Sequence, residues 1–209
     1  MLTLKENRTF ATILADGLIH INCAEGTEGG KWRTYKTSDG TEGKKFEKVY
    51  SEIIGKISKI GFQEGKFGVQ LQLTIADGAE EPVVLCMSTS SNYGEDTMKK
   101  LPNVDLEKTV KIVPFSFKDE KGKAKKGVTI YQKDDKGETV KLGNYFYDAT
   151  TKANINGYPT PKPTKKERTS DQWKLYYGEA REFLIEFITE KFKIDETTVA
   201  EVDPIGDNW

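Results

Sequence analysis

Alternation of apolar and polar residues predicts that most of this chain is β-strand. In residues 67–75, FGVQLQLTI, every second residue is apolar and the residues between them are small or polar. A period of two sustained over this length predicts a strand with one buried face and one solvent-exposed face, and the buried face is expected to start at Phe67. Similar short strands, separated by glycine-rich turns, are predicted at residues 52–60, 82–87, 109–117 and 127–132.

The first fifty residues add two hairpins to this pattern. Residues 8–24 break at Ala15-Asp16-Gly17, which is a strong signal for a short hairpin. Residues 37–43, TSDGTEG, separate KWRTYK from KKFEKVY and predict either a second hairpin or a mobile loop.

Two segments have helical character. Residues 94–104 have a helix-like composition as far as Pro102, and residues 171–192 repeat apolar side chains every three or four positions. Thr169 and Gln172 predict a capping box at the start of the longer helix. The apolar stripe of this helix consists of Trp173, Tyr176, Tyr177, Ala180, Phe183, Leu184, Phe187 and Ile188. It is expected to pack on its own domain, and the alternative is that it packs on a partner or a second subunit.

Five short strands with a helix between the third and the fourth are typical of the OB-fold, a closed or nearly closed small barrel. The segments GKISKI, EGKFGVQLQLTI and DLEKTVKIVPFSF resemble strands of OB-fold single-stranded-DNA-binding proteins, particularly those of bacteriophages. We therefore expect a mainly β protein with a five-stranded OB-type barrel, an N-terminal β extension and one C-terminal amphipathic helix. The expected parts are residues 1–50 (β-hairpin extension), 51–150 (OB-fold core), 151–170 (Pro/Lys linker), 171–194 (helix) and 195–209 (disordered acidic tail).

Charge is distributed unevenly along the chain. The net charge is −1, but residues 195–209 contain five acids and no lysine or arginine, which leaves 32 basic residues against 28 acids in the rest. Residues 111–133 alone hold seven lysines against two acids. The uneven distribution of charge is therefore more informative than the net charge, and the body is only mildly basic.

Aromatic and basic residues occur together in several places, above all in residues 115–132, FSFKDEKGKAKKGVTIYQ. Stacking of a base on an aromatic ring is worth about 1–3 kcal/mol, and lysines neutralise phosphates. The alternative is that the phenylalanines are core residues and the lysines solvate a turn, and Pro114 predicts a bulge or a sheet edge there. The expected base contacts are Trp32, Tyr35, Phe62, Phe115, Phe117, Tyr131, Tyr145 and Tyr147, and the expected phosphate contacts are Lys31, Arg33, Lys66, Lys118, Lys123, Lys125 and Lys126.

The acidic end, VAEVDPIGDNW, also resembles the tails of bacterial and phage single-stranded-DNA-binding proteins. That resemblance implies a tail that occupies the basic groove when DNA is absent and docks on replication or recombination proteins through Asp203, Asp207 and Trp209. This tail is less acidic than many in the family and ends in Trp where the bacterial tails have Phe, so no particular partner is implied. The alternative is a disordered, solubilising end.

Catalytic and metal-binding patterns are weak. Two distant cysteines in apolar runs and one histidine do not make a zinc site, and Cys23 and Cys86 are expected to be reduced, which fits a cytoplasmic protein. Residues 25–32 lack the first glycine and the final hydroxyl of a phosphate-binding loop. No run of about eighteen apolar residues is present, and residues 1–10 do not read as a signal peptide. We expect no enzyme activity, no cofactor and no membrane association.

Together these patterns predict sequence-independent binding of single-stranded DNA in replication or recombination. RNA is an alternative ligand, because stacking does not sense the 2′-hydroxyl. The rival function is a protein–protein adaptor or assembly module, and a weaker rival is an accessory domain of an enzyme that acts on nucleic acid. The sequence leaves the oligomeric state open.

Overall fold

Strands dominate the protein, whose structure is a computed structural model that describes residues 8–37, 40–65, 67–78, 81–161 and 169–194. The N-terminal strands are β1 (Thr9–Ile13), β2 (Ile19–Asn22), β3 (Lys31–Lys36) and β4 (Glu42–Tyr50). The central strands are β5 (Ile53–Gly65), β6 (Gly68–Ala76), β7 (Val83–Ser88), β8 (Val110–Lys118), β9 (Ala124–Lys133) and β10 (Thr139–Lys141). The remaining elements are α1 (Asn92–Lys100), the 3₁₀ turn η1 (Leu101–Asn103), the strands β11 (Tyr147–Asp148) and β12 (Ala153–Asn154), and α2 (Ser170–Phe192).

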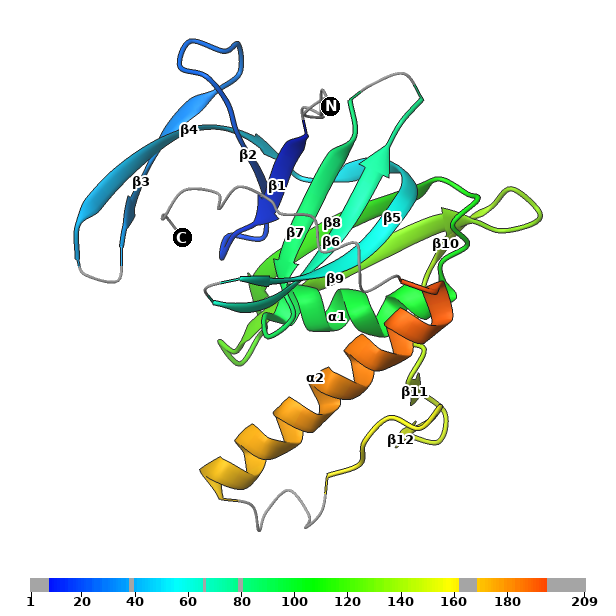
Figure 1. The fold of residues 1–209 in the computed structure, drawn as a ribbon. Coiled ribbons are helices and arrows are strands. Elements are labelled where there is room, and N and C mark those ends of the chain that lie inside the picture. Colours follow the sequence, from blue (N-terminus) through cyan, green and yellow to red (C-terminus); the bar gives the residue numbers. More distant parts are fainter. Residues whose placement is uncertain (1–7, 38–39, 66, 79–80, 162–168, 195–209) are drawn as a thin grey trace, which may run out of the picture.

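One open mixed sheet contains ten of these strands in the order β10-β9-β8-β5-β6-β7-β1-β2-β4-β3, and β11 and β12 form a separate pair. Figure 1 shows α1 below the sheet and α2 crossing beyond α1. We call the sheet face that these helices cover the inner face and the opposite face the outer face. The β3–β4 hairpin, residues 31–50, projects from the sheet on the side away from α2, and we call it the arm (Figure 1).

The inner face is the hydrophobic core. In β6, Leu71, Leu73 and Ile75 are buried on this face, and Gln70, Gln72 and Thr74 alternate with them on the outer face. The core is completed from the helical side by Met98 and Leu101 near α1 and by Leu184 and Ile188 of α2.

Both helices begin at capping residues. The Ser91 side chain accepts a hydrogen bond from Gly94 N at the start of α1, and the capping box predicted for Thr169 and Gln172 is confirmed at the start of α2. The apolar stripe of α2 packs on its own domain through Ala180, Leu184 and Ile188. None of the helices in the described ranges is long and apolar enough to cross a membrane.

The expected OB-type barrel is wrong, because the described strands form an open sheet and no ladder joins β7 to β9. The edge of β7 is occupied by β1, which runs parallel to it from Thr9 to Thr12. The edge of β9 away from β8 is occupied by β10 from Tyr131 to Lys133. Farther along β9, α1 satisfies Val128: Asp96 Oδ2 accepts a hydrogen bond from Val128 N at 2.7 Å, and Lys100 Nζ donates one to Val128 O. Because both edges already have hydrogen-bond partners, nothing drives closure.

The turn expected between the first two central strands also lies elsewhere. Residues 61–65 continue β5 as a regular strand, and the chain reverses only between Gly65 and Gly68, which pair with each other. Gly68 has φ +96°, a conformation that favours glycine. Phe67 therefore lies at the hairpin tip with 62% of its surface exposed, where a start of the buried face was expected.

Candidate nucleic-acid interface

The β8–β9 hairpin carries a row of aromatic side chains on the outer face of the sheet. Phe117 is paired with Lys125, Phe115 with Gly127, and Tyr131 with Lys111, so all of these side chains project to one side. Phe117 is 56% exposed, Phe115 is half-buried, and their ring centroids lie 5.7 Å apart. We call Lys111, Phe115, Phe117, Lys125 and Tyr131 the hairpin surface.

Pro114 does not disturb this hairpin. The β8–β9 register is unbroken from Val110 to Lys118, so the predicted bulge is absent. The β5–β8 ladder covers only Val110 to Ile112, which leaves Pro114 beyond it at an edge where no backbone donor is required.

Three of the four expected hairpin lysines, Lys118, Lys123 and Lys125, are exposed. Lys125 Nζ lies 3.8 Å from Asp119 Oδ2, and Lys111 Nζ lies 5.5 Å from the centroid of the Tyr131 ring. Lys126 opposes Ser116 and Lys118 opposes Ala124, so both project to the other face and do not share a face with the phenylalanines. The hairpin surface thus combines flat rings with two lysines, Lys125 and Lys111, the second of which also lies 3.4 Å from Glu52 Oε2.

The KWRTYK segment forms β3, and its alternation divides the expected contacts between two faces. Trp32 pairs with Phe46 and packs edge-on against it at 5.3 Å, with 54% of its surface exposed. Arg33 and Tyr35 point to the opposite face of the arm, as does Lys31, which is exposed at the start of β3. Trp32 therefore does not act together with Arg33 and Tyr35.

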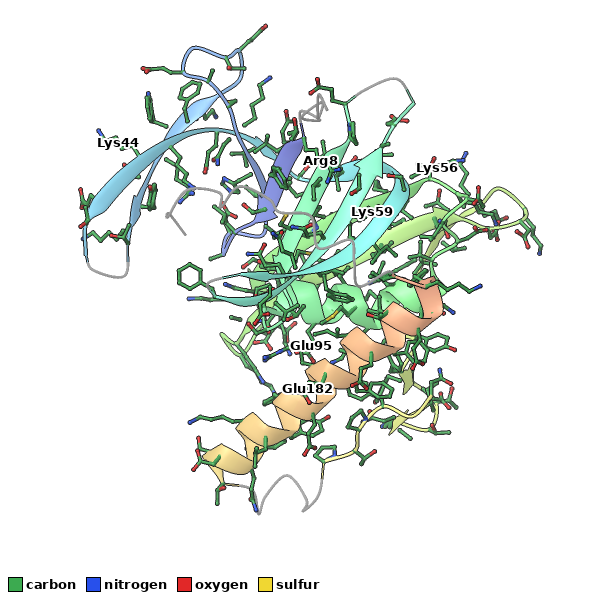
Figure 2. The ribbon with its side chains drawn as sticks, viewed as in Figure 1. Arg8, Lys44, Lys56, Lys59, Glu95 and Glu182 are labelled. Atoms are coloured by element: carbon green, nitrogen blue, oxygen red, sulfur yellow. The ribbon has the colours of Figure 1, made fainter. Side chains whose placement is uncertain are left out.

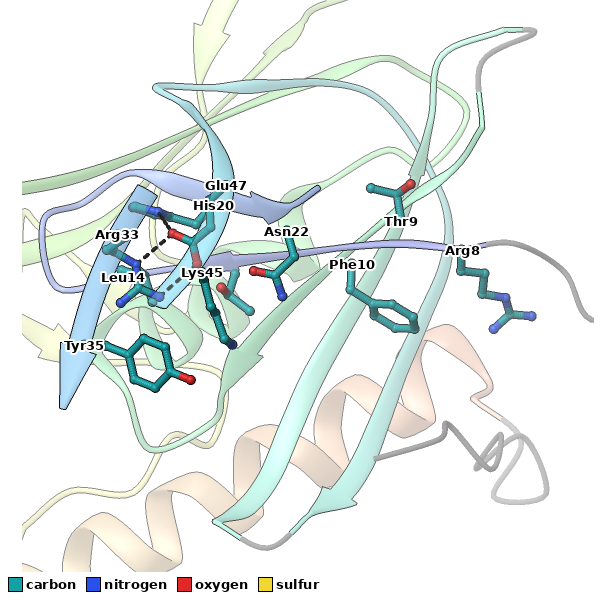
Figure 3. Close-up of a pocket in the computed structure, with 11 residues that line it drawn as sticks. Arg8, Thr9, Phe10, Leu14, His20, Asn22, Arg33, Tyr35, Lys45 and Glu47 are labelled. Carbon is teal, nitrogen blue, oxygen red and sulfur yellow. Dashed lines mark hydrogen bonds and ion pairs between the residues drawn. The ribbon is translucent and has the colours of Figure 1, made fainter. Parts of the chain in front are cut away.

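Beneath the arm lies a pocket of about 340 Å³, formed by β1, β2, β3 and β4 (Figure 3). Its lining includes two aromatic rings, three cations and an amide: Phe10, Tyr35, Arg8, Arg33, Lys45 and Asn22. The Tyr35 ring lies so close over Gly43 that a Cβ there would have no room, and Arg33 Cζ and Lys45 Nζ each lie 5.5 Å from its centroid.

A buried charge network fixes the arm to the sheet at the base of this pocket. Glu47 is 3% exposed and accepts hydrogen bonds from Arg33 Nε at 2.7 Å and Arg33 Nη2 at 2.9 Å. His20 Nδ1 lies 2.9 Å from Glu47 Oε2, and His20 Nε2 lies 3.0 Å from Asp16 Oδ2 in the β1–β2 turn. The network therefore links β2, β3, β4 and that turn.

These contacts set the protonation of the network. Burial by itself would raise the pKa of Glu47, but the hydrogen bonds from Arg33 and His20 outweigh burial, and the pKa is lowered. The hydrogen bond to Glu47 raises the pKa of Arg33 despite partial burial. Burial lowers the pKa of Lys45, and the charge of Glu47 opposes that change.

The remaining expected contacts lie elsewhere. Phe62 packs against the core from β5, and Tyr145 packs against Phe146 and Phe187 beside α2, so neither ring is a free stacking platform. Tyr147 is exposed in β11, on the α2 side of the molecule (Figure 1). Lys66, Asp203, Asp207 and Trp209 lie outside the described residues.

Several residues of the pocket were not expected from the sequence. Phe10 and Asn22 come from β1 and β2, and Lys45 follows Lys44 in β4 on the pocket side of the arm. Figure 2 shows Arg8 and Lys44 together with Lys56 and Lys59 on the sheet side of the molecule, while Glu95 and Glu182 lie on the helices. The sheet therefore offers the more favourable surface for a polyanion.

The chain matches no protein-family model, no curated protein and no solved structure. In the part of the chain that the structure describes, no group of three His, Cys, Asp or Glu side chains is arranged to hold a metal ion.

Proposed function

We propose that this protein binds single-stranded DNA without sequence preference. The observation that carries the proposal is the hairpin surface, where Phe117 and Phe115 stand on the outer face of the sheet beside Lys125. Core phenylalanines would have pointed to the inner face, toward α1 and α2. Two adjacent rings on one face of the sheet beside a lysine form an apolar patch with a polar rim, which is typical of an interaction surface.

The chemistry of this surface suits unpaired nucleotides. Phe117 and Tyr131 are separated by the length of β8 from residue 117 to residue 111, about 20 Å at the usual rise per residue. Bases can stack along this row, each stacking contact being worth about 1–3 kcal/mol, while Lys125 and Lys111 neutralise phosphates. Stacking accepts any base, so sequence preference is not required.

Duplex DNA fits less well. Reading a duplex usually requires a helix in the major groove or a strongly basic surface. The exposed side of the long helix α2 carries Glu179, Glu182 and Glu186, which would repel phosphates.

The acidic tail, residues 195–209, is proposed to compete with DNA for the basic surfaces and to recruit replication or recombination proteins. Its five acids and terminal Trp209 support this role. Deletion of these residues should tighten oligonucleotide binding at low salt. Unchanged affinity would show that the tail does not compete with DNA. The recruitment role would then be tested separately, by measuring the binding of partner proteins.

The direct experiment is titration of a fluorescent thirty-nucleotide oligo-dT with the protein at about 50 and 200 mM salt, with tryptophan fluorescence recorded in parallel. We expect binding that weakens by about tenfold or more at the higher salt, because phosphate contacts release counterions. Quenching that is lost in Trp32→Phe would place the strand near Trp32, which is exposed on the arm. Absence of binding at the lower salt would refute the proposal.

The adaptor function is favoured by one feature of α2. Its first ten residues contribute no buried side chain, Leu175 is 67% exposed, and the rings of Trp173 and Tyr177 stack with centroids 5.5 Å apart. An adaptor would use this half of α2 to hold a partner and would show no salt-dependent oligonucleotide binding.

A further inference from the structure

We infer that the pocket beneath the arm holds one nucleotide of the bound strand, with its base between Phe10 and Tyr35 and the two phosphates that flank it near Lys45 and Arg8, which lie at different ends of the pocket (Figure 3). This inference rests on the proposed function, but it concerns a different site from the hairpin surface. The hairpin surface is an open row of rings, whereas this site is a pocket bounded by four strands.

The shape of the pocket is the first argument. Figure 3 shows the Tyr35 ring at one end and the Phe10 ring at the other, with Asn22 between them. Each ring comes from a different part of the sheet, Phe10 from β1 and Tyr35 from the arm, which is fixed to β2 by the Glu47 network. Two rings separated by a polar floor can accept one flat heterocycle that is hydrogen-bonded along its edge.

The hydrogen-bonding groups are the second argument. Asn22 is exposed toward the pocket and its amide offers both donors and an acceptor, and the Thr12 hydroxyl lies in the same lining. A base edge presents donors and acceptors side by side, so it can use both kinds of group. A carboxylate of an acidic peptide needs donors alone, which makes the peptide the poorer fit.

The charges are the third argument. Three cations line the pocket, and one of them, Arg33, is bonded to Glu47 through two of its nitrogens. Glu47 also lines the pocket, and both of its oxygens accept hydrogen bonds from Arg33. The lining therefore holds three cations against one carboxylate, and its net charge is positive.

The arm provides a matched pair of lysines to test the inference. Lys45 pairs with Arg33 on the pocket face, whereas Lys44 pairs with Thr34 on the opposite face. We expect Lys45→Gln in the full-length protein to weaken oligo-dT binding about fivefold and to lower the salt slope by about one. We expect Lys44→Gln, which changes the net charge equally, to weaken binding less than about twofold. Equal effects of the two substitutions would overturn the inference.

A second measurement does not depend on substitutions. An oligo-dT containing 5-iodouracil, crosslinked to the protein by light and analysed by mass spectrometry, should attach to Phe10 or Tyr35 in addition to the hairpin surface. Crosslinks confined to Phe115, Phe117 and Tyr131 would overturn the inference and leave the proposed function standing. Failure of the oligonucleotide to bind at all would overturn both.

The third measurement addresses the competing occupant. A synthetic peptide of residues 199–209 is titrated against the protein lacking residues 195–209 and against its Lys45→Gln and Asn22→Ala variants. We expect Asn22→Ala to weaken the binding of oligo-dT about threefold, because hydrogen bonds to the base are lost. We expect the same substitution to leave the binding of the peptide unchanged. If the variants lose the peptide and keep full oligo-dT affinity, the pocket binds the tail and the inference is wrong.

Discussion

The body of the sheet and the arm are stabilised by different interactions. The body, β5 to β9 with α1 and α2, buries Leu71, Leu73 and Ile112 completely on its inner face. Among the described residues no helix covers the arm, and its buried polar contacts include the ion pair between Arg33 and Glu47 and the hydrogen bond between His20 and Glu47. Apolar packing in the body tolerates changes of pH, whereas a buried carboxylate makes the anchoring of the arm responsive to pH.

The two regions therefore support the two proposed binding sites in different ways. The body determines the position of the hairpin surface through strand register, and the arm closes a pocket whose walls depend on one carboxylate. Substitutions in the two regions should therefore fail in different ways, one globally and the other locally.

The largest effect is expected from the body. Leu73→Ala removes a completely buried side chain from the middle of β6 and should lower the free energy of unfolding by about 2–5 kcal/mol. Chemical denaturation followed by circular dichroism measures this loss. A change below about 1 kcal/mol would mean that the inner face is not the close-packed core described above.

A smaller and local effect is expected from the arm. Glu47→Gln leaves Arg33 and His20 without their carboxylate and should destabilise the anchoring of the arm by about 3 kcal/mol. Amide hydrogen exchange should become faster in β3 and β4 and stay unchanged in β6. The control is Glu42→Gln, which removes only an exposed pair with Lys36 at 3.7 Å and should cost less than about 0.5 kcal/mol. Equal exchange in both variants would contradict the ionic anchor.

Acid should loosen the arm before it unfolds the body. The pKa of Glu47 is lower in the folded protein than its ordinary value of 4.5, so its contribution is complete above that value and is lost as pH falls through the lowered pKa. Tryptophan fluorescence should report this transition through Trp32, which packs on Phe46 of the arm, and the signal should be lost in Trp32→Phe, because the chain has two other tryptophans. The transition should be absent in Glu47→Gln. A transition that persists in that variant would assign the acid sensitivity to another group.

The smallest effect is expected from single lysines of the hairpin. Lys125→Gln should lower the slope of log affinity against log salt by about one, since one phosphate contact is lost. Lys136, an exposed lysine of the β9–β10 turn, is the control, because Lys136→Gln changes the net charge equally and Lys136 is not part of the hairpin surface. Lys136→Gln should leave the slope unchanged, and an equal change would mean that the lysines act only through net charge.

Local patterns in the sequence predict the local structure well. The alternation in residues 67–75 places Leu71, Leu73 and Ile75 on the inner face, and the Thr169–Gln172 capping box begins α2 as expected. These signals succeed because each depends on residues a few positions apart.

The closure of the sheet and the composition of the pocket depend on distant residues. Whether β7 and β9 meet depends on the parallel pairing of β1 with β7 and on Asp96 and Lys100 of α1. The alternation within one strand does not show which strand or helix will occupy its edge. The division of KWRTYK between two faces follows from strand alternation alone and could have been predicted. The pocket could not, because it requires the registers that bring β1 and β2 beside the arm.

The central claim is that the aromatic rings on the outer face of β8 and β9 bind unpaired bases. The most direct test is the affinity of a thirty-nucleotide oligo-dT for a Phe115→Ala/Phe117→Ala double variant, compared with Tyr177→Ala, which removes an exposed ring from α2. The proposal predicts a loss of at least about tenfold for the double variant, from about 1–3 kcal/mol per stacked base, and no loss for Tyr177→Ala. Wild-type affinity in a folded double variant would contradict it.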